Sequence, residues 1–136
     1  MSKILLLSHA NLCQEFYNTI ELIMGKPDER VEFITLPYGA DIDEYQKKIE
    51  EKVGNAGKEG ILVLTDLFGG SPFMISTKVY REMKDDVPME LVTGMNLPMI
   101  VELMTNLDKP VTELKTIALE AGVGGVVDFS NLIDNN

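Results

Sequence analysis

Short apolar runs alternate along the chain with longer stretches in which apolar residues recur every three or four positions. The runs within residues 3–8 and 60–65 are unbroken, which is typical of strands buried on both faces of a parallel sheet. Residues 31–35 and 89–93 predict two further strands of weaker apolar character. The pattern therefore predicts a strand followed by a helix, repeated along the chain.

A stretch with helical periodicity follows each predicted strand. Gly25 and Pro27 end the first helix and Gly54 ends the second, because glycine and proline commonly follow helix ends. Asn96 caps a fourth helix and places Pro98 in its first turn, where proline is tolerated. The apolar positions of the first three helices are Leu12, Phe16, Ile20 and Ile23, then Ile42, Tyr45, Ile49 and Val53, then Ile75, Val79 and Met83.

The last third of the chain departs from this alternation. Leu114, Ile117, Ala118 and Ala121 predict a helix with no strand before it. Residues 126–129 predict a short final strand, and the glycines just before it indicate an irregular or edge element.

Repeated strand–helix units predict an α/β fold, here a three-layer sandwich with a mainly parallel sheet and right-handed crossovers. The two most apolar strands belong at the centre, which gives the strand order 2-1-3-4. With 136 residues, the chain matches one domain that spans residues 1–136. In such sheets the functional crevice lies at the carboxyl ends of the strands where the chain order reverses, here between the first and third strands.

Composition narrows the class of partner. A formal net charge of −10 opposes nucleic acids and anionic membranes, so we expect neither as a partner. The apolar runs are far shorter than the ~20 residues of a membrane span, and we expect no signal peptide at the start of the chain. We therefore expect a cytoplasmic protein that meets the membrane only through partner components. One cysteine and one histidine are too few for a disulfide or a structural zinc site, so no metal is expected.

His9 and Asp66 stand at the carboxyl ends of the first and third predicted strands. Neighbouring strands lie about 4.8 Å apart, so we expect the imidazole to face the carboxylate. A carboxylate that accepts from one ring N–H fixes the tautomer and leaves the other nitrogen free as a nucleophile or base. His9 and Asp66 are therefore the predicted catalytic pair, although Asp66 taken alone also suits a helix or turn cap.

The segment Gly69-Gly-Ser-Pro72 follows Asp66 and begins the third helix. Two glycines let the backbone approach an anion closely, and Ser71 before Pro72 fits an N-cap and a first helical turn. Free N–H groups and the helix dipole attract anions there, so Gly69, Gly70 and Ser71 are the predicted phosphoryl-binding residues. Together with the catalytic pair they predict transient phosphorylation of a histidine, for which no cofactor is required.

Three segments carry a resemblance to a known family. They are Leu5-Leu-Leu-Ser-His9, Leu64-Thr-Asp-Leu-Phe-Gly-Gly-Ser-Pro-Phe73 and Gly94-Met-Asn-Leu-Pro-Met-Ile-Val-Glu102. With them, the chain resembles the mannose-family enzyme IIA component of the bacterial phosphoenolpyruvate-dependent sugar phosphotransferase system over almost its whole length. The long second segment is the specific one, and the other two support it.

The resemblance implies that His9 is phosphorylated, that Asp66 is its hydrogen-bond partner, and that Ser71 with the preceding glycines surrounds the phosphoryl group. It implies a phosphotransferase that takes this group from the histidine-containing phosphocarrier protein and passes it to a IIB component, which serves a membrane-embedded sugar transporter. Because the sequence leaves no room for a fused IIB domain, we expect that acceptor to be a separate polypeptide. A homodimer is also implied, with a C-terminal antiparallel strand that can be exchanged between subunits.

Ala10 departs from the family pattern, in which glycine commonly follows the active histidine. If the loop requires a positive φ at this position, alanine strains it by about 1–2 kcal/mol. His9 remains the predicted site of phosphorylation. Alanine at position 10 could affect docking of the phosphoryl donor or the rate of phosphoryl transfer.

Two further features allow more than one interpretation. Cys13 is interpreted as a small buried residue rather than a nucleophile, because no base stands near it in the sequence. Several large apolar residues fill the core or else form an apolar collar that docks partner proteins. The residues in question are Met95, Met99, Met104, Phe68 and Phe73.

Other functions compete for the same architecture. A receiver domain would be phosphorylated at Asp66, but it needs an acidic pair after the first strand, where Ser8 and His9 stand. A flavodoxin-type binder needs a Gly- or Ser/Thr-rich loop there, which residues 10–12 do not supply. Two alternatives stay open: a regulatory module whose phosphohistidine state a partner reads, and a phosphotransfer subunit that serves a dihydroxyacetone kinase.

Overall fold

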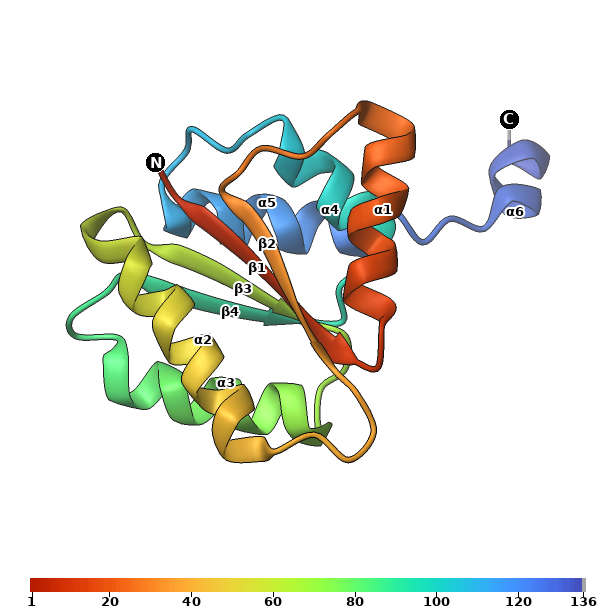
Figure 1. Ribbon diagram of the computed structural model, residues 1–136. Coiled ribbons are helices and arrows are strands. Elements are labelled where there is room, and N and C mark those ends of the chain that lie inside the picture. Colours follow the sequence, from red (N-terminus) through yellow and green to blue (C-terminus); the bar gives the residue numbers. More distant parts are fainter. Residues whose placement is uncertain (136) are drawn as a thin grey trace.

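The computed structural model describes residues 1–135, and Figure 1 shows a central sheet with helices on both sides. None of the helices in this described part has the length and apolar content needed to cross a membrane. The strands are β1 (Lys3–His9), β2 (Val31–Leu36), β3 (Ile61–Thr65) and β4 (Met89–Thr93). The helices are α1 (Leu12–Met24), α2 (Ile42–Ala56), the short 3₁₀ helix η1 (Gly57–Glu59), α3 (Gly70–Met83), α4 (Leu97–Met104), α5 (Val111–Gly124) and α6 (Phe129–Asp134).

The sheet has the predicted order, β2-β1-β3-β4, and every neighbouring pair is parallel. All residues of β3 and the middle of β1 are buried, which explains why these two strands have the most apolar sequences. β2 and β4 lie at the two edges, and most of their residues are only half-buried. The α/β sandwich with strand order 2-1-3-4 is therefore confirmed.

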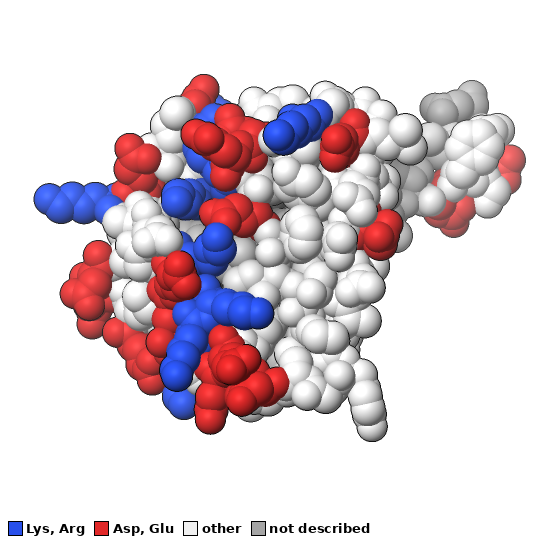
Figure 2. Space-filling view, in the orientation of Figure 1, with Lys and Arg blue, Asp and Glu red and all other residues white. Residues whose placement is uncertain are grey.

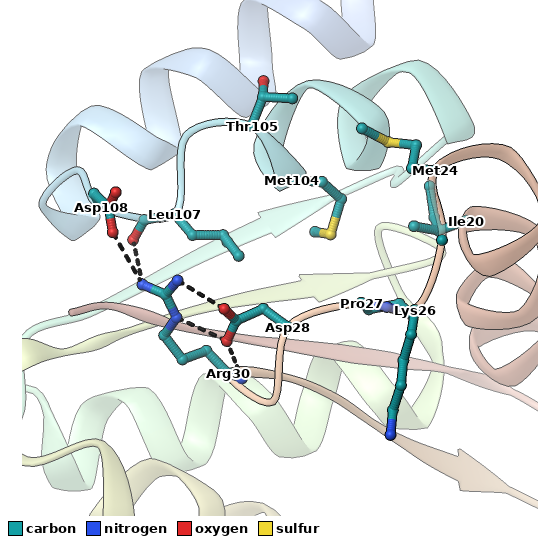
Figure 3. A pocket seen from close by; sticks show the side chains of 11 residues that line it. Ile20, Met24, Lys26, Pro27, Asp28, Arg30, Met104, Thr105, Leu107 and Asp108 are labelled. Carbon is teal, nitrogen blue, oxygen red and sulfur yellow. Dashed lines mark hydrogen bonds and ion pairs between the residues drawn. The ribbon is translucent and has the colours of Figure 1, made fainter.

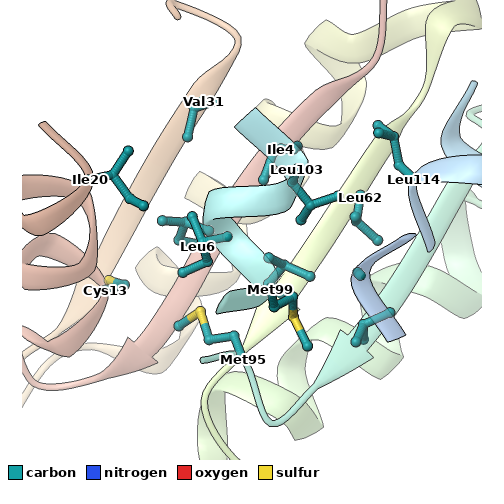
Figure 4. Close-up of a cluster of buried hydrophobic side chains, with 14 of the residues drawn as sticks. Ile4, Leu6, Cys13, Ile20, Val31, Leu62, Met95, Met99, Leu103 and Leu114 are labelled. Carbon is teal, nitrogen blue, oxygen red and sulfur yellow. The ribbon is translucent and has the colours of Figure 1, made fainter. Parts of the chain in front are cut away.

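Alternate side chains of the sheet enter two separate cores. Leu6 and Leu62 lie in the first core, which α1, α4 and α5 cover (Figures 1 and 4). Leu7 and Val63 lie in the second core, beneath α2 and α3. Because β1 and β3 contribute to both cores, their carboxyl ends are held firmly in place.

Caps explain where two of the helices begin or end. α2 continues past Gly54, the predicted end, and Gly57 caps it with a φ of 56°. α4 begins as predicted, because the Asn96 Oδ1 accepts a hydrogen bond from the Met99 backbone N–H at 3.0 Å.

The prediction of a strand at residues 126–129 is wrong, because no strand forms there in the described part of the chain. Residues 126–128 have no regular structure, and α6 begins at Phe129. In Figure 1 this C-terminal segment projects away from the body. Its valines favour a strand locally, but a strand needs an edge to pair with, and these side chains are exposed. The Asp128 Oδ1 instead accepts from the Asn131 backbone N–H at 3.0 Å and caps the helix.

Gly60, which joins η1 to β3, has a backbone conformation that other residues avoid, with φ 85° and ψ 176°. A Cβ there would lie 2.6 Å from the Pro88 carbonyl oxygen and 2.8 Å from the Val111 Cγ2. Gly25 has almost the same conformation, φ 90° and ψ 179°, with nothing within 4 Å of a built Cβ. Substitution of Gly25 would introduce backbone strain alone, whereas substitution of Gly60 would introduce backbone strain and a steric clash.

We expect Gly25→Ala to lower the free energy of unfolding by about 1–3 kcal/mol, through backbone strain alone. Gly60→Ala should lower it by about 1–3 kcal/mol more, because its Cβ also overlaps a carbonyl oxygen. Urea unfolding of both variants measures the difference. Equal losses would contradict the packing explanation.

Candidate functional site

The parallel sheet brings His9 and Asp66 together, because His9 ends β1 and Asp66 directly follows the neighbouring β3. The Asp66 Oδ2 lies 2.9 Å from the His9 Nδ1 and 3.0 Å from the His9 backbone nitrogen. One carboxylate oxygen thus accepts hydrogen bonds from both the ring and the main chain of the same residue. This double contact fixes the rotamer of the imidazole.

The two side chains differ in their access to solvent. The His9 side chain is 46% exposed, whereas the Asp66 side chain is 11% exposed. An ionised carboxylate only accepts hydrogen bonds, so Nδ1 carries the ring proton and Nε2 keeps a free lone pair. The arrangement therefore presents a nucleophilic nitrogen to solvent above a shielded negative charge.

Gly70 packs directly against the His9 ring. A Cβ built on Gly70 would lie 2.6 Å from both the Cε1 and the Nε2 of His9. Only glycine allows the ring to sit this close to the main chain while it is bonded to Asp66. The backbone at the start of α3 therefore lies beside the free nitrogen.

The start of α3 differs slightly from the prediction. Gly69 is the N-cap, with φ 118°, and the helix begins at Gly70, so Ser71 lies in the first turn rather than at the cap. The first N–H groups of a helix have no partner within it and point along the positive end of the dipole. Of the three predicted phosphoryl-binding residues, Gly70 lies against the His9 ring, and Gly69 and Ser71 flank it at the start of α3. A helix start in this place suits an anion at Nε2.

Ala10 has a φ of 50°, so the loop after His9 does require the left-handed conformation. Its backbone N–H donates to the Leu36 carbonyl at 2.9 Å, and its carbonyl accepts from the Leu36 N–H at 3.4 Å. These bonds hold alanine in a conformation that costs about 1–2 kcal/mol.

Ser8 is a site residue that the sequence analysis missed. Its buried Oγ accepts from the Cys13 backbone N–H at 2.7 Å and donates to the His9 carbonyl at 3.0 Å. It thereby ties the start of α1 to the residue that carries the imidazole. The signal in the sequence was a hydroxyl residue at the end of an otherwise apolar strand, directly before His9.

Cys13 is buried in the first core, as the sequence analysis interpreted it. Burial raises the pKa of its thiol, so the sulfur stays protonated at neutral pH. It therefore has the character of a packing residue.

The apolar collar is wrong for its three methionines, and the alternative of a core position is confirmed for Met95 and Met99. Met95 and Met99 are buried in the core, and Met104 lines a cleft at the other end of the sheet. Sequence spacing near the carboxyl edge did not reveal which side of each segment faces solvent.

Phe68 of the predicted collar is 79% exposed at the carboxyl edge of the sheet, and the Phe73 ring packs against it with 4.8 Å between the ring centroids. Further apolar side chains are exposed at this edge. The loops at this edge contribute two carboxylates, Asp41 and Asp66, but no Lys or Arg. In Figure 2 the lower right part of the molecule, toward which the strands point, likewise shows no Lys or Arg. We define the apolar rim as the exposed residues Leu12, Tyr38, Leu67, Phe68 and Met74.

The cleft at the opposite end of the sheet has a volume of about 230 Å³ and includes Arg30 (Figure 3). Asp28 and Asp108 both pair with the Arg30 guanidinium, at 2.9 Å and 3.3 Å. The guanidinium lowers the pKa of Asp28 to about 2. These charges are paired with one another, and they hold the loop before β2 against the loop between α4 and α5.

The chain is similar in sequence to components of the phosphotransferase system. A model of the EIIA-man family, described as the fructose IIA component of the phosphotransferase system, matches residues 3–116. The mannose-specific EIIAB component of Escherichia coli K12 is 30% identical over 122 residues, which are 88% of this chain and 36% of that protein. This chain therefore spans about a third of the length of the first curated relatives it matches. The sorbose-specific EIIA component of Lacticaseibacillus casei is 29% identical over 112 residues, 76% of this chain and 72% of that protein.

Solved structures match over nearly the whole chain. The phosphotransferase component EIIA from Streptococcus agalactiae has a TM-score of 0.87 and 30% identity, covering 96% of this chain and 99% of its own. The mannose/sorbose-specific IIA subunit from Enterococcus faecalis has a TM-score of 0.79 and 25% identity, covering 93% of each chain. The fold described above is therefore shared with solved EIIA proteins.

Substitution of the glycine beside the ring tests this geometry. We expect Gly70→Ala to push the imidazole away from Asp66, so that Nδ1 no longer holds the ring proton preferentially. The matched control is Gly69→Ala. Gly69 also has a positive φ, but a Cβ built on it has no atom within 4 Å, so this substitution strains the backbone without touching the ring. Proton–nitrogen NMR reads the tautomer directly, because the chain has a single histidine. An unchanged tautomer in Gly70→Ala would contradict the described contact.

Proposed function

Because the chain belongs to the EIIA-man family of phosphotransferase-system components, we propose that it carries a phosphoryl group on His9. It accepts this group from the histidine-containing phosphocarrier protein and passes it to a IIB component for sugar uptake and phosphorylation. The observation that supports the proposal most is an exposed imidazole whose Nδ1 lies 2.9 Å from a shielded carboxylate. That pairing leaves Nε2 as the nucleophile.

The transfer requires no proton movement at His9. The Nε2 lone pair attacks the phosphorus of the donor's phosphohistidine, and the donor's P–N bond breaks as the new P–N bond forms. The His9 ring becomes a phosphoimidazolium that keeps its proton on Nδ1, where Asp66 balances the positive charge. In the second transfer the acceptor attacks phosphorus, and the electron pair of the P–N bond returns to Nε2.

The start of α3 supplies the electrostatic part of this mechanism. A phosphoryl group on Nε2 lies beside Gly70, because that nitrogen already packs against the glycine. The backbone N–H groups of Gly70 and Ser71, together with the Ser71 hydroxyl, are the donors available to its oxygens. Pro72 follows them and contributes no N–H.

The apolar rim suits docking of protein partners. Exposed apolar side chains such as Phe68 and Leu67 lie next to Asp66 in the loop that precedes α3. The absence of Lys and Arg from the carboxyl-edge loops favours a partner with basic groups around its own reactive residue. Rapid transfer from phosphorylated His9 to a IIB protein distinguishes a carrier from a regulatory module, which would hold its label.

We also propose that the chain works as a homodimer. Among the described residues, β4 pairs only with β3, so its outer edge is free. Beside it lies a groove of about 320 Å³ that includes Met99, Leu119 and Val123. The apolar C-terminal segment of the same chain projects into solvent and offers Phe129 and its neighbours as the occupant from a second copy. Exchange of the two segments covers both exposed surfaces.

Phosphorylation by enzyme I, phosphocarrier protein and phosphoenolpyruvate tests the proposed carrier. We expect one acid-labile, base-stable phosphate per chain, because the product is a phosphohistidine. His9→Ala should take up none. Retention of label in that variant would end the proposal.

Asp66→Asn should fold normally and transfer the group about 100-fold more slowly, because the amide does not balance the charge of the phosphorylated ring. Rapid-quench measurement of a single turnover gives the rate. A wild-type rate would remove Asp66 from the mechanism.

A chain that ends after Gly125 should be monomeric where the full chain is dimeric, because the exchanged segment is lost. Sedimentation measures the mass of each. Leu22→Ser is the control, since Leu22 is 85% exposed on α1 and lies outside the groove. A monomeric full chain, or a dimeric shortened one, would disprove the proposed dimer.

A further inference from the structure

Three buried polar atoms have no hydrogen-bond partner within residues 1–135. They are the Tyr45 Oη, the Thr65 Oγ1 and the Asp66 Oδ1. Buried polar atoms are nearly always bonded, so unpaired ones are uncommon and call for a physical reason. The third of them belongs to the carboxylate that orients His9.

The three groups gather on one side of the sheet. Tyr45 is 3% exposed and lies in the core beneath α2 and α3. Side chains alternate along β3, so Thr65 points to the same side as Ile61 and Val63, which belong to that core. Asp66 is the next residue along the chain. Tyr45 stands near the start of α2, which begins at the carboxyl edge of the sheet, and the charge of Asp66 acts on its hydroxyl.

The ionisation of Tyr45 agrees with this placement. Burial above all, and then the negative charge of Asp66, raise the pKa of the Tyr45 hydroxyl. The hydroxyl therefore keeps its proton and can donate, while the Asp66 carboxylate only accepts.

We propose that Tyr45 is a positioning residue for the phosphoryl transfer at His9, an inference that rests on the proposed function. The hydroxyls of Tyr45 and Thr65 and the inner oxygen of Asp66, Oδ1, bind one buried water molecule. A buried water makes about three hydrogen bonds to polar groups that otherwise lack partners, which matches these three atoms.

Such a network acts on the carboxylate and only through it on the ring. Oδ2 already accepts from the ring and the backbone of His9, so a bond at Oδ1 stops the carboxylate from turning about its Cβ–Cγ bond. The proton then stays on Nδ1 and the lone pair stays on Nε2. Without the network, the carboxylate turns more freely and the ring samples its other tautomer.

Tyr45→Phe tests the proposal, because it removes the hydroxyl and keeps the buried ring. We expect single-turnover phosphorylation by the phosphorylated phosphocarrier protein to slow about tenfold, as when the outer partner of a metal-bound histidine is lost. Proton–nitrogen NMR of the unphosphorylated protein should show less of the Nδ1–H tautomer. Tyr80→Phe is the matched control, since Tyr80 packs against the same core near the amino ends of the strands. It should change neither measurement.

Thr65→Val removes a second hydroxyl of the network and should change both measurements in the same direction. It decides the question by itself if Tyr45→Phe does not fold. A folded Tyr45→Phe with wild-type rate and tautomer would overturn the proposal, and so would a slower rate with an unchanged tautomer. If wild-type His9 takes up no phosphate, the proposed function fails, whereas the tautomer comparison still tests the network.

Discussion

The parallel pairing of β1 with β3 is the constraint on which the site depends. Leu7 is paired with Thr65, so the residues that follow these positions emerge at the same edge of the sheet. Both strands contribute to two cores, and a shift of one residue would turn every side chain toward the wrong core. Burial therefore enforces the register, and the register places the imidazole of His9 beside the carboxylate of Asp66.

The same edge contains the least relaxed backbone near the site. Ala10, Gly69 and Gly70 all have positive φ values, of 50°, 118° and 76°. Glycine adopts such values at little cost, whereas alanine does so only because Leu36 holds it through two backbone hydrogen bonds. Strain of this kind persists where the surrounding structure determines it, and here the two cores on either side of the sheet do so.

The strand order and the meeting of His9 with Asp66 could be predicted from the sequence, because both follow from local or periodic patterns of apolar residues. Unbroken apolar runs identified β1 and β3 as central, and topology then brought His9 to Asp66. The strand predicted at residues 126–129 failed because pairing depends on a partner edge and not on propensity alone. The apolar collar failed for Met95 and Met99 but not for Phe68, because spacing along the chain does not say which side of a loop faces solvent.

Tyr45 shows a further limit of sequence patterns. Its helical spacing correctly predicted a core position on α2. The pattern carried no information about where the hydroxyl ends up, because that depends on how α2 packs across the sheet. Buried polar atoms such as this one become visible only when the elements are assembled.

The Nδ1 side of the imidazole is bonded to Asp66, so a protein partner can reach only the other edge of the ring. For a carrier, both protein partners must then approach along one route, and each excludes the other while it is bound. In the proposed carrier, the acceptor therefore binds only after the donor has dissociated, and the overall rate of transfer depends on how quickly each complex dissociates.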